Sequence, residues 1–348
     1  KDYIPNVNKK YSKVFFSGIC FDSSKVKKDN IFFAIKGNKY DGNHYIDVAI
    51  KKGAKVIVSE KKNAIKKDEI VSLYSSNVRK LLANVAYKIL RKKPRKLIAV
   101  TGTNGKSSIS DFFFQILNLN YKKVASIGTI GIRYQNKKEI LPNTTLDPIQ
   151  LSSILKKLKK KKIEFIILEA SSHGLDQNRL DGLLFDIGIF TNLSHDHLDY
   201  HKNLKNYLNA KLYLFNNLIK NRGRIISDQS IPEFNIIKKI ALNKKFKLHS
   251  IFDNSGNFKI VSHKFKNESQ LLKIKYKNVM TDIKINLIGK IQLKNILMSI
   301  IAANNNKLSL DKIFKVIPKI KPIEGRFEKI GTIKNKSKVI LDYAHTPE

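Results

Sequence analysis

The chain of 348 residues carries 67 Lys and Arg against 28 Asp and Glu, a formal net charge of +39, and 42% of its residues are apolar. This length accommodates two or three domains with substantial cores. No apolar run approaches the roughly 18 residues of a membrane span, the N-terminus has no signal-peptide core, and the single Cys20 cannot form an internal disulfide. We therefore expect a cytoplasmic protein with no membrane partner, and a monomer by default.

The positive charge is compatible with nucleic-acid binding, because basic surfaces attract phosphate backbones. The lysines, however, are spread along the whole chain and accompany abundant Asn and Ile. That pattern is typical of compositional drift that places lysines on solvated faces. We expect no specific nucleic-acid partner.

The first part of the chain alternates short apolar runs with turns, which predicts a small α/β unit. The expected elements are short apolar strands over 14–16, 31–35 and 56–58 and a helix over 45–52. A second helix is expected over 78–90, and the polar, proline-broken stretch 91–95 indicates a domain junction. Polar residues at 22–24 and 36–42 follow strands, where they either meet a ligand or simply form turns.

Residues 97–108 read Leu-Ile-Ala-Val-Thr-Gly-Thr-Asn-Gly-Lys-Ser-Ser, which indicates a strand, a glycine-bracketed turn and the start of a helix. Gly102 and Gly105 allow backbone N–H groups to approach phosphate oxygens, and the helix N-terminus adds a favourable dipole. Position 100 is Val where the general phosphate-loop pattern has its first Gly. The alternative is a plain glycine turn, but the flanking strand and helix favour a nucleotide site.

The polar residues that end this loop suit the same chemistry. Lys106 is expected to reach the outer phosphates of a nucleotide. Ser107 or Ser108 is expected to offer a hydroxyl to Mg²⁺.

Near-continuous apolar runs follow, at 124–128, 165–168 and 185–190, with a helix expected over 149–160. Buried parallel strands have this appearance, so we expect a doubly wound, mostly parallel central sheet. Glu169 ends one of these strands, where its carboxylate would hold a metal ion or, alternatively, cap a helix or form a salt bridge.

Three histidines follow the run at 185–190, namely His195, His197 and His201. Their spacing fits no common tetrahedral zinc set and no cysteine accompanies them. A magnesium–phosphate site with one histidine ligand is the better interpretation.

The remainder is less informative. Short β-like runs occur at 236–237, 258–261, 271–276 and 283–288. A helix is expected over 292–303, a second junction over 315–322, and a new strand at 339–343. We therefore expect domains over 1–93 and 94–321, and the beginning of a truncated third domain over 322–348.

Several motifs occur in order along the chain: Thr101-Gly102-Thr103-Asn104-Gly105-Lys106-Ser107, Asn143-Thr144-Thr145, Glu169 to Arg179, Phe190 to His201, Gly325-Arg326-Phe327-Glu328 and Asp342-Tyr343-Ala344-His345-Thr346-Pro347. Together they resemble the Mur ligases, and within that family the MurE type. The resemblance runs from Cys20 to the last residue.

This resemblance implies three domains: a small N-terminal α/β domain for the UDP end of the substrate, a central ATPase domain with the phosphate loop, and a C-terminal Rossmann-like domain that supplies the amino acid. It also implies ATP-driven amide formation, in which the γ-carboxylate of D-Glu in UDP-MurNAc-L-Ala-D-Glu is phosphorylated and then attacked by an amine of lysine or meso-diaminopimelate. A carboxylate is a poor electrophile until one oxygen becomes a good leaving group, which agrees with this route.

The resemblance also implies site residues. The ATP-binding set comprises Gly102, Thr103, Asn104, Gly105, Lys106, Ser107, Ser108, Asn295, Arg326, Asp342 and His345. The metal set, for Mg²⁺, comprises Ser107, Glu169, His197 and Lys211, the last as a carbamate (N6-carboxylysine), and the catalytic set is Lys106, Glu169, His197 and Lys211. The set for the UDP-MurNAc-dipeptide comprises Phe21, Ser23, Asn38, Lys39, Tyr40, Asn143, Thr144, Thr145, Ser171, Gln177 and Arg179.

The chain also departs from the family pattern. Gly289-Lys290-Ile291-Gln292 stands where Gly-x-Phe-Asn is usual, Ser107-Ser108 replaces Thr-Thr, and His195 replaces a common Arg. The Asp-Asn-Pro-Arg motif that selects the amino acid is absent.

Two alternatives remain. One is a sister ligase that adds a different residue or extends folate with glutamate. The other is a non-catalytic nucleotide-binding or nucleic-acid-binding protein, whose binding would not depend on Lys211 or Glu169.

Overall fold

The computed structural model describes residues 3–4, 11, 13–37, 40–62, 69–90, 93–251, 259–266, 269–276, 278–333 and 337–343. Three residues assigned to the site from the sequence, Asn38, Lys39 and His345, lie outside these ranges. The chain divides into two compact units. The N-terminal unit comprises Lys1–Lys93, Leu146–Lys157 and Gln177–Leu183, and the central unit comprises Pro94–Thr145, Leu158–Asp176 and Leu184–Glu348.

The N-terminal unit contains a four-stranded parallel sheet in the order β1-β2-β3-β4. Its elements are β1 (Gly18–Cys20), the 3₁₀ helix η2 (Ser23–Lys25), β2 (Asn30–Phe33), the 3₁₀ helix η3 (Gly42–Tyr45), α1 (Ile46–Lys51), β3 (Ala54–Ser59), β4 (Val71–Tyr74) and α2 (Val78–Ile89). The expected strand over 14–16 is wrong. Val14 and Phe16 pack against the core without forming a strand, and the first strand begins at Gly18.

The central unit is built on an eight-stranded sheet in the order β12-β11-β10-β5-β9-β6-β7-β8. The strands are β5 (Lys96–Thr101), β6 (Val124–Gly128), β7 (Gly131–Tyr134), β8 (Lys137–Glu139), β9 (Phe165–Glu169), β10 (Phe185–Phe190), β11 (Ile219–Asp228) and β12 (Lys247–Ile251). All neighbours pair in parallel except at β7 and β8, which form an antiparallel edge hairpin. This confirms the expected α/β fold with a mostly parallel central sheet.

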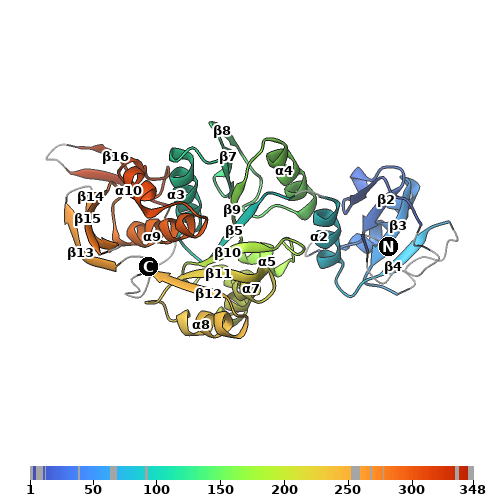
Figure 1. Cartoon of the computed structure of the whole chain (residues 1–348). Helices are drawn as coiled ribbons and strands as arrows, with labels where there is room; N and C mark the ends of the chain where they lie inside the picture. Colours follow the sequence, from blue (N-terminus) through green and yellow to red (C-terminus); the bar gives the residue numbers. More distant parts are fainter. Residues whose placement is uncertain are drawn as a thin grey trace. The chain divides into compact units, whose positions relative to one another are not determined.

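Helices cover both faces of this sheet (Figure 1). The helices of the central unit are α3 (Lys106–Leu119), α5 (Ser172–Asp176), α6 (Leu198–His201), α7 (Leu204–Asn217), α8 (Phe234–Asn243), α9 (Lys290–Asn305) and α10 (Leu310–Val316), followed by the 3₁₀ helix η4 (Ile317–Lys319). The helix α4 (Pro148–Lys160) begins within the N-terminal unit. Because side chains alternate along a strand, Ile98 and Val100 join the core under α3 and α9. On the other face Phe190 packs on Phe215 of α7, with ring centres 6.1 Å apart.

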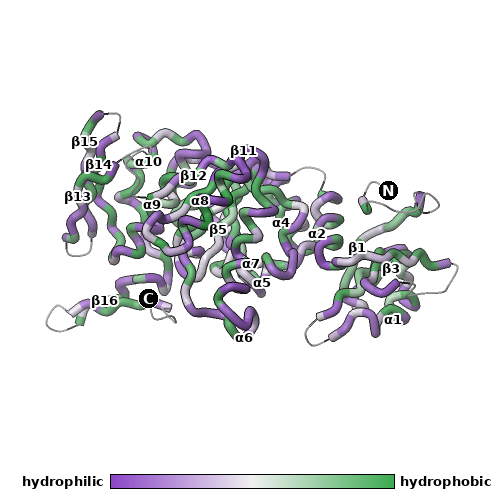
Figure 2. The backbone as a smooth tube through the Cα atoms, turned by 90° about the horizontal axis from the view of Figure 1, so that it is seen from below, coloured by the Kyte–Doolittle hydropathy of each residue, from purple (hydrophilic) through white to green (hydrophobic). Residues whose placement is uncertain are grey.

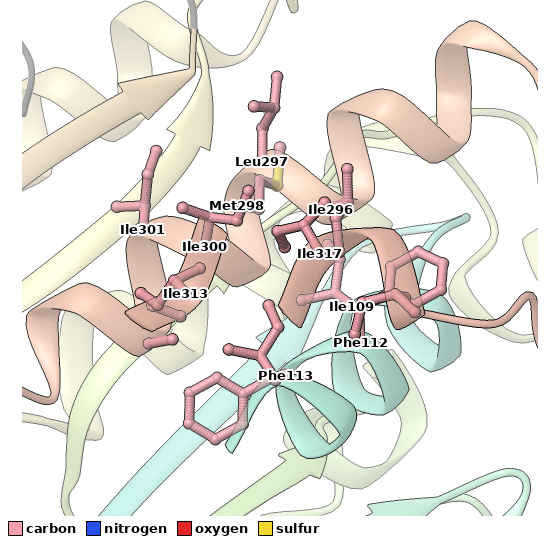
Figure 3. Packing of buried hydrophobic residues seen from close by; sticks show 14 of the residues in the cluster. Ile109, Phe112, Phe113, Ile296, Leu297, Met298, Ile300, Ile301, Ile313 and Ile317 are labelled. Carbon is pink, nitrogen blue, oxygen red and sulfur yellow. The ribbon is translucent and has the colours of Figure 1, made fainter. Parts of the chain in front are cut away.

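The main core of the central unit lies between α3, α9 and α10. Ile109, Phe112 and Phe113 of α3 are fully buried beside Ile296 of α9 and Ile317 of η4 (Figure 3). The Ser299 hydroxyl also donates to the Ile109 carbonyl at 3.1 Å, which joins the two helices directly. This packing fixes α9 against α3, the helix that carries Lys106 at its first turn.

A three-stranded antiparallel sheet follows in the chain, formed by β13 (Lys259–Lys266), β14 (Ser269–Tyr276) and β15 (Val279–Ile285). Polar and apolar residues alternate along these strands (Figure 2), and apolar ones such as Leu272 and Ile283 join the main core. A two-stranded antiparallel ribbon, β16 (Glu328–Thr332) with β17 (Lys338–Leu341), ends the described chain.

Two further expectations need correction. Residues 236–237 are not β-like, because they lie in α8, where Ile237 and Ala241 are buried four residues apart on one helix face. The run at 283–288 stops pairing at Ile285, and Phe258 of the run at 258–261 lies outside the described residues. Across the described ranges, the structure contains no helix of the length and apolarity that a bilayer crossing requires.

Candidate active site

A cavity of about 270 Å³ opens in the central unit at the carboxyl ends of β5, β9 and β10. Residues assigned to the site from the sequence line much of it: Thr103, Asn104, Gly105, Lys106, Ser107, Ser108, Thr144, Glu169, Ser171, His197, Lys211, Asn295, Arg326 and Asp342. Ligands of open α/β sheets bind at this edge, where successive connections leave the sheet in opposite directions. The structure therefore brings these residues, which are far apart in the sequence, to one place.

The phosphate loop connects β5 to α3 and is held from behind by the segment after β10. The Thr103 amide donates to the Asn192 carbonyl at 3.0 Å, and the Thr191 hydroxyl donates to the Asn104 carbonyl at 2.6 Å. Gly102 has φ of 146°, and a Cβ at this position would overlap the Thr191 hydroxyl, so only glycine fits. The loop is thus held in one shape, as phosphate binding by backbone N–H groups requires.

Lys106 begins α3 and folds back over the loop. Its Nζ donates to the carbonyls of Gly102 at 3.0 Å and Thr103 at 2.6 Å. Burial lowers the pKa of Lys106, and the nearby carboxylates of Glu169 and Asp196 partly offset that effect. The ammonium is therefore held at the loop, within the cavity that a nucleotide would enter.

Glu169, the last residue of β9, is buried and lies across from the loop. Its Oε2 accepts from the Ser107 hydroxyl at 3.0 Å, which places together two of the oxygens expected to bind Mg²⁺. Burial raises the pKa of Glu169, whereas Lys106 and the hydrogen bonds to the carboxylate lower it. A carboxylate in such a place gains from a divalent cation, because the cation compensates the buried negative charge.

Lys211 comes from the middle of α7 and is only 1% exposed. Its Nζ donates to the Gly102 carbonyl at 2.7 Å and lies 4.0 Å from the centre of the Tyr207 ring. Burial, and then the positive charge of Lys106, lower the pKa of Lys211 well below its usual value. Lys211 is thus a buried amine and not an exposed surface lysine.

His197 is the N-cap residue of α6 and has a left-handed backbone, with φ of 51°. Its amide donates to Asp196 Oδ1 at 2.8 Å, and its Nε2 lies 3.4 Å from Asp196 Oδ2. A non-glycine residue in this conformation costs on the order of 1 kcal/mol, and such residues concentrate at functional sites. The half-exposed ring faces His173, with ring centres 4.9 Å apart.

The far wall of the cavity comes from α9 and the segment before β16. The Asn295 Oδ1 packs against Gly105, where a Cβ would lie only 2.6 Å away. Its Nδ2 donates to Gln292 at 3.1 Å, and Gln292 in turn donates to the Arg326 carbonyl at 3.2 Å. Gln292, the departure from the family pattern, therefore joins two of the expected ATP-binding residues. A third, Asp342, accepts from the Phe327 amide at 3.0 Å.

Residues expected to bind the nucleotide sugar lie in both units. In the central unit, Thr144 and Ser171 line the cavity, and Asn143 is exposed on the preceding loop. The Thr145 hydroxyl donates to the Glu169 carbonyl at 2.8 Å and accepts from the Ser171 amide at 3.0 Å. Thr145 thus supports the backbone of the site.

In the N-terminal unit, Arg179 donates from Nε and from one terminal nitrogen to the Gln177 side-chain oxygen, at 3.1 and 2.8 Å. This pairing holds the guanidinium plane in one orientation. The other described residues of the set, Phe21, Ser23 and Tyr40, lie on loops or at η2, and Tyr40 is 71% exposed.

Sequence reasoning did not assign several residues that also line the cavity: Thr129, Asp196, Tyr207, Ile291, Gln292 and Phe327. Thr129 directly follows β6, so its place after an apolar run was a usable signal. Tyr207 carries no such signal, since one tyrosine in a predicted helix is usually a core residue.

A strand, phosphate loop and helix at the edge of a parallel sheet, with a buried carboxylate and two lysines lining the same cavity, defines a class of nucleotide-dependent phosphoryl-transfer enzymes. Comparison with known families makes this specific. The family model for the Mur ligase middle domain matches residues 100–303, and the model for the Mur ligase family, catalytic domain, matches residues 16–99. The chain belongs to the Mur ligase family.

Individual relatives agree with this assignment. The UDP-N-acetylmuramoyl-L-alanyl-D-glutamate–2,6-diaminopimelate ligase of Rickettsia prowazekii (strain Madrid E) is 34% identical over 347 residues, which cover 99% of this chain and 71% of that protein. The enzyme of the same name from Buchnera aphidicola subsp. Schizaphis graminum (strain Sg) is 36% identical, with 96% of this chain and 69% of that protein covered.

Solved structures give the same result. A structure of a UDP-N-acetylmuramoyl-L-alanyl-D-glutamate–2,6-diaminopimelate ligase superposes with a TM-score of 0.82 at 28% identity, covering 95% of this chain and 68% of that one. The MurF ligase of Thermotoga maritima in complex with ADP shares the fold, with a TM-score of 0.61 at 18% identity, covering 92% of this chain and 70% of that one.

Proposed function

We propose that this protein is an ATP-dependent ligase that joins 2,6-diaminopimelate to UDP-N-acetylmuramoyl-L-alanyl-D-glutamate in peptidoglycan precursor synthesis. The observation that carries the proposal is the cavity in which the phosphate loop, Glu169 and Lys211 meet. The names of the relatives favour diaminopimelate over lysine as the added amino acid.

The reaction follows from the groups that line the cavity. The loop amides and Lys106 bind the ATP phosphates, so that the γ-phosphoryl group transfers to an oxygen of the substrate carboxylate, giving an acyl phosphate and ADP. The amine of the amino acid then attacks the acyl carbon, forming the amide and releasing inorganic phosphate. Positioning and neutralisation of charge account for most of the catalysis in such transfers.

The residues present fit Mg²⁺. The hydroxyl of Ser107 and the carboxylate of Glu169 are hard oxygen ligands 3.0 Å apart, the spacing expected of neighbouring ligands in an octahedron with bonds of about 2.1 Å. Among the described residues, no three His, Cys, Asp or Glu side chains form a complete metal cage. That is the usual condition for Mg²⁺, which takes one or two protein carboxylates together with substrate phosphates and water. Mg²⁺ would neutralise charge that develops on the transferring phosphoryl group.

The buried Lys211 amine fits the assigned carbamate. A neutral amine can add to carbon dioxide, forming an N–C bond and releasing a proton, and the product carries oxygens that a metal ion prefers. His197 would bind a second Mg²⁺, besides the one at Ser107 and Glu169, through an imidazole nitrogen. We also infer a cytoplasmic, monomeric enzyme, with Arg179 binding the nucleotide-sugar substrate.

The test is phosphate release from ATP by the full protein, measured with UDP-MurNAc-L-Ala-D-Glu and either diaminopimelate or lysine. We expect release only when the dipeptide substrate is present, and greater turnover with diaminopimelate. Phosphate release that does not depend on the dipeptide would exclude the proposed function. Release that lysine stimulates but diaminopimelate does not would make lysine the added amino acid.

Substrate binding tests the site assignment separately. Arg179→Ala should weaken binding of the UDP-MurNAc-dipeptide, measured by calorimetry, by about tenfold or more, because a charge-assisted pair contributes about 1.5–3 kcal/mol. Affinity equal to that of the unmodified protein would remove Arg179 from the substrate site.

A further inference from the structure

Thr129 is a residue of the cavity to which no role has been assigned. It follows β6 directly and lines the cavity, in the loop that leads to β7. Because β6 pairs in parallel with β9, the carboxyl ends of the two strands lie side by side. This pairing brings Thr129 next to Glu169, although 40 residues separate them.

Thr129 binds both oxygens of the Glu169 carboxylate. Its backbone amide donates to Oε1 at 3.0 Å, and its hydroxyl donates to Oε2 at 3.1 Å. The carboxylate also packs on the backbone of Gly128, where any Cβ would overlap it. The Gly128–Thr129 backbone and the Thr129 hydroxyl therefore hold the carboxylate plane in one orientation.

The hydroxyl of Thr129 also contacts a residue that is expected to bind the nucleotide sugar. It lies 3.0 Å from the hydroxyl of Thr144, in the segment assigned to the nucleotide-sugar substrate. With the Thr129 proton directed to Glu169, the Thr144 hydroxyl supplies the proton of the second hydrogen bond. Hydrogen bonds in such a chain polarise and strengthen one another.

We propose that Thr129 is a positioning residue for the metal-binding carboxylate: its hydroxyl fixes the Glu169 oxygens toward Ser107, so that they receive Mg²⁺ without reorganising. This inference rests on the proposed function, in which Glu169 binds Mg²⁺ with ATP. Partners that orient a metal ligand typically change metal affinity 10- to 100-fold when they are removed.

The experiment compares Thr129→Val with Thr129→Ser in the full protein. Valine keeps the shape and the backbone amide bond but removes the hydroxyl, whereas serine keeps both hydrogen bonds. Mn²⁺ binding in the presence of a non-hydrolysable ATP analogue, followed by electron paramagnetic resonance, gives the metal affinity without turnover. Thr101→Val is the matched control, because within the described part of the chain the buried Thr101 hydroxyl has no hydrogen-bond partner.

We expect Thr129→Val to weaken Mn²⁺ binding about tenfold, with Thr129→Ser and Thr101→Val within about twofold of the unmodified protein. The thermal midpoint of each variant, measured in parallel, shows whether it is folded. Glu169→Gln tests the metal site itself, separately from the positioning role of Thr129. If it leaves Mn²⁺ affinity unchanged, the metal site itself is misassigned. If Glu169→Gln weakens binding and a folded Thr129→Val does not, Thr129 has no positioning role.

Discussion

Lys211 is a residue whose charged form its surroundings disfavour. It is almost fully buried, and a positive neighbour, Lys106, shares with it the Gly102 carbonyl as hydrogen-bond acceptor. Burial of an amine of this kind reduces stability, a cost that proteins commonly bear at functional sites. Its surroundings therefore support a chemical role for the amine.

We predict that Lys211→Met separates stability from activity. Methionine fills a similar volume without a charged group, so the free energy of unfolding should stay equal or rise by about 1 kcal/mol. ATP turnover should fall about 100-fold or more, because a metal ligand is lost. Chemical denaturation and the phosphate-release assay measure the two quantities. In ¹³C-bicarbonate the unmodified protein should show a carbamate resonance that the variant lacks.

A fall in both stability and activity would contradict this view of Lys211 and indicate a purely structural lysine. The matched control is Lys205, an exposed lysine in the first turn of the same helix, α7. Lys205→Met should change neither quantity appreciably, because its ammonium already lies in solvent.

Individual residues were predictable from the sequence where a local pattern states their chemistry. The glycines and lysine of residues 102–106 are such a case, since strand, turn and helix follow one another directly. The place of Thr129 at the end of a strand was open to prediction, but its contact with Glu169, 40 residues away in the chain, was not, because that contact depends on β6 pairing with β9. Local sequence does not specify which strands become neighbours.

At the scale of elements, one carboxylate joins three strands of the central sheet. Asp186 of β10 accepts from the Leu97 amide of β5 at 3.0 Å, from Lys96 at 2.9 Å and from Lys220 of β11 at 2.8 Å. Burial alone would raise the pKa of Asp186, but the hydrogen bonds from Lys220, Lys96 and Leu97 outweigh it and hold the pKa below its usual value.

The lowered pKa gives a pH-dependent stability. Because the pKa of Asp186 is lower in the folded state, its contribution is fully present above the unfolded-state value of about 3.9 and is lost as pH falls through the folded-state value. Asp186→Asn should therefore reduce the free energy of unfolding by about 2 kcal/mol at pH 7, with a difference that shrinks as the pH falls below about 3.9. Urea denaturation at several pH values measures this, and a difference that does not shrink on acidification would contradict it.

Strands were predicted correctly where a run of residues is apolar throughout. Elements were missed or misassigned where the local sequence carried no clear turn signal or only a short apolar run. The runs at 124–128, 165–168 and 185–190 are the strands β6, β9 and β10, because buried parallel strands are apolar throughout. The hairpin of β7 and β8 gave no glycine-rich turn signal, since Gln135 takes the left-handed conformation there, with φ of 52°. In α8, the two adjacent isoleucines at 236–237 resemble a strand in sequence. The structure shows instead that the buried side chains, Ile237 and Ala241, lie four residues apart, as on one face of a helix.

For the molecule as a whole, the net charge of +39 should act without sequence preference. We expect retention on heparin that is lost at modest salt, and no preference among oligonucleotides. Dissolved salt strongly screens the attraction between a polyanion and charges that are dispersed over an exposed surface. Salt-titrated chromatography and competition between oligonucleotides measure this. Binding to one sequence that persists at high salt would show a specific nucleic-acid partner.

The N-terminal unit is assembled from three separate stretches of chain. One of them, 177–183, contacts α2 and the residue before it: Asn178 accepts from Asn77 at 3.0 Å, and the Arg179 carbonyl accepts from Tyr87 at 2.7 Å. A fragment ending at residue 93 would therefore leave the buried Tyr87 hydroxyl without this acceptor. In genetic terms, this unit cannot be exchanged between proteins as one contiguous cassette, since the arginine proposed to bind its substrate is encoded within the gene segment for the ATPase.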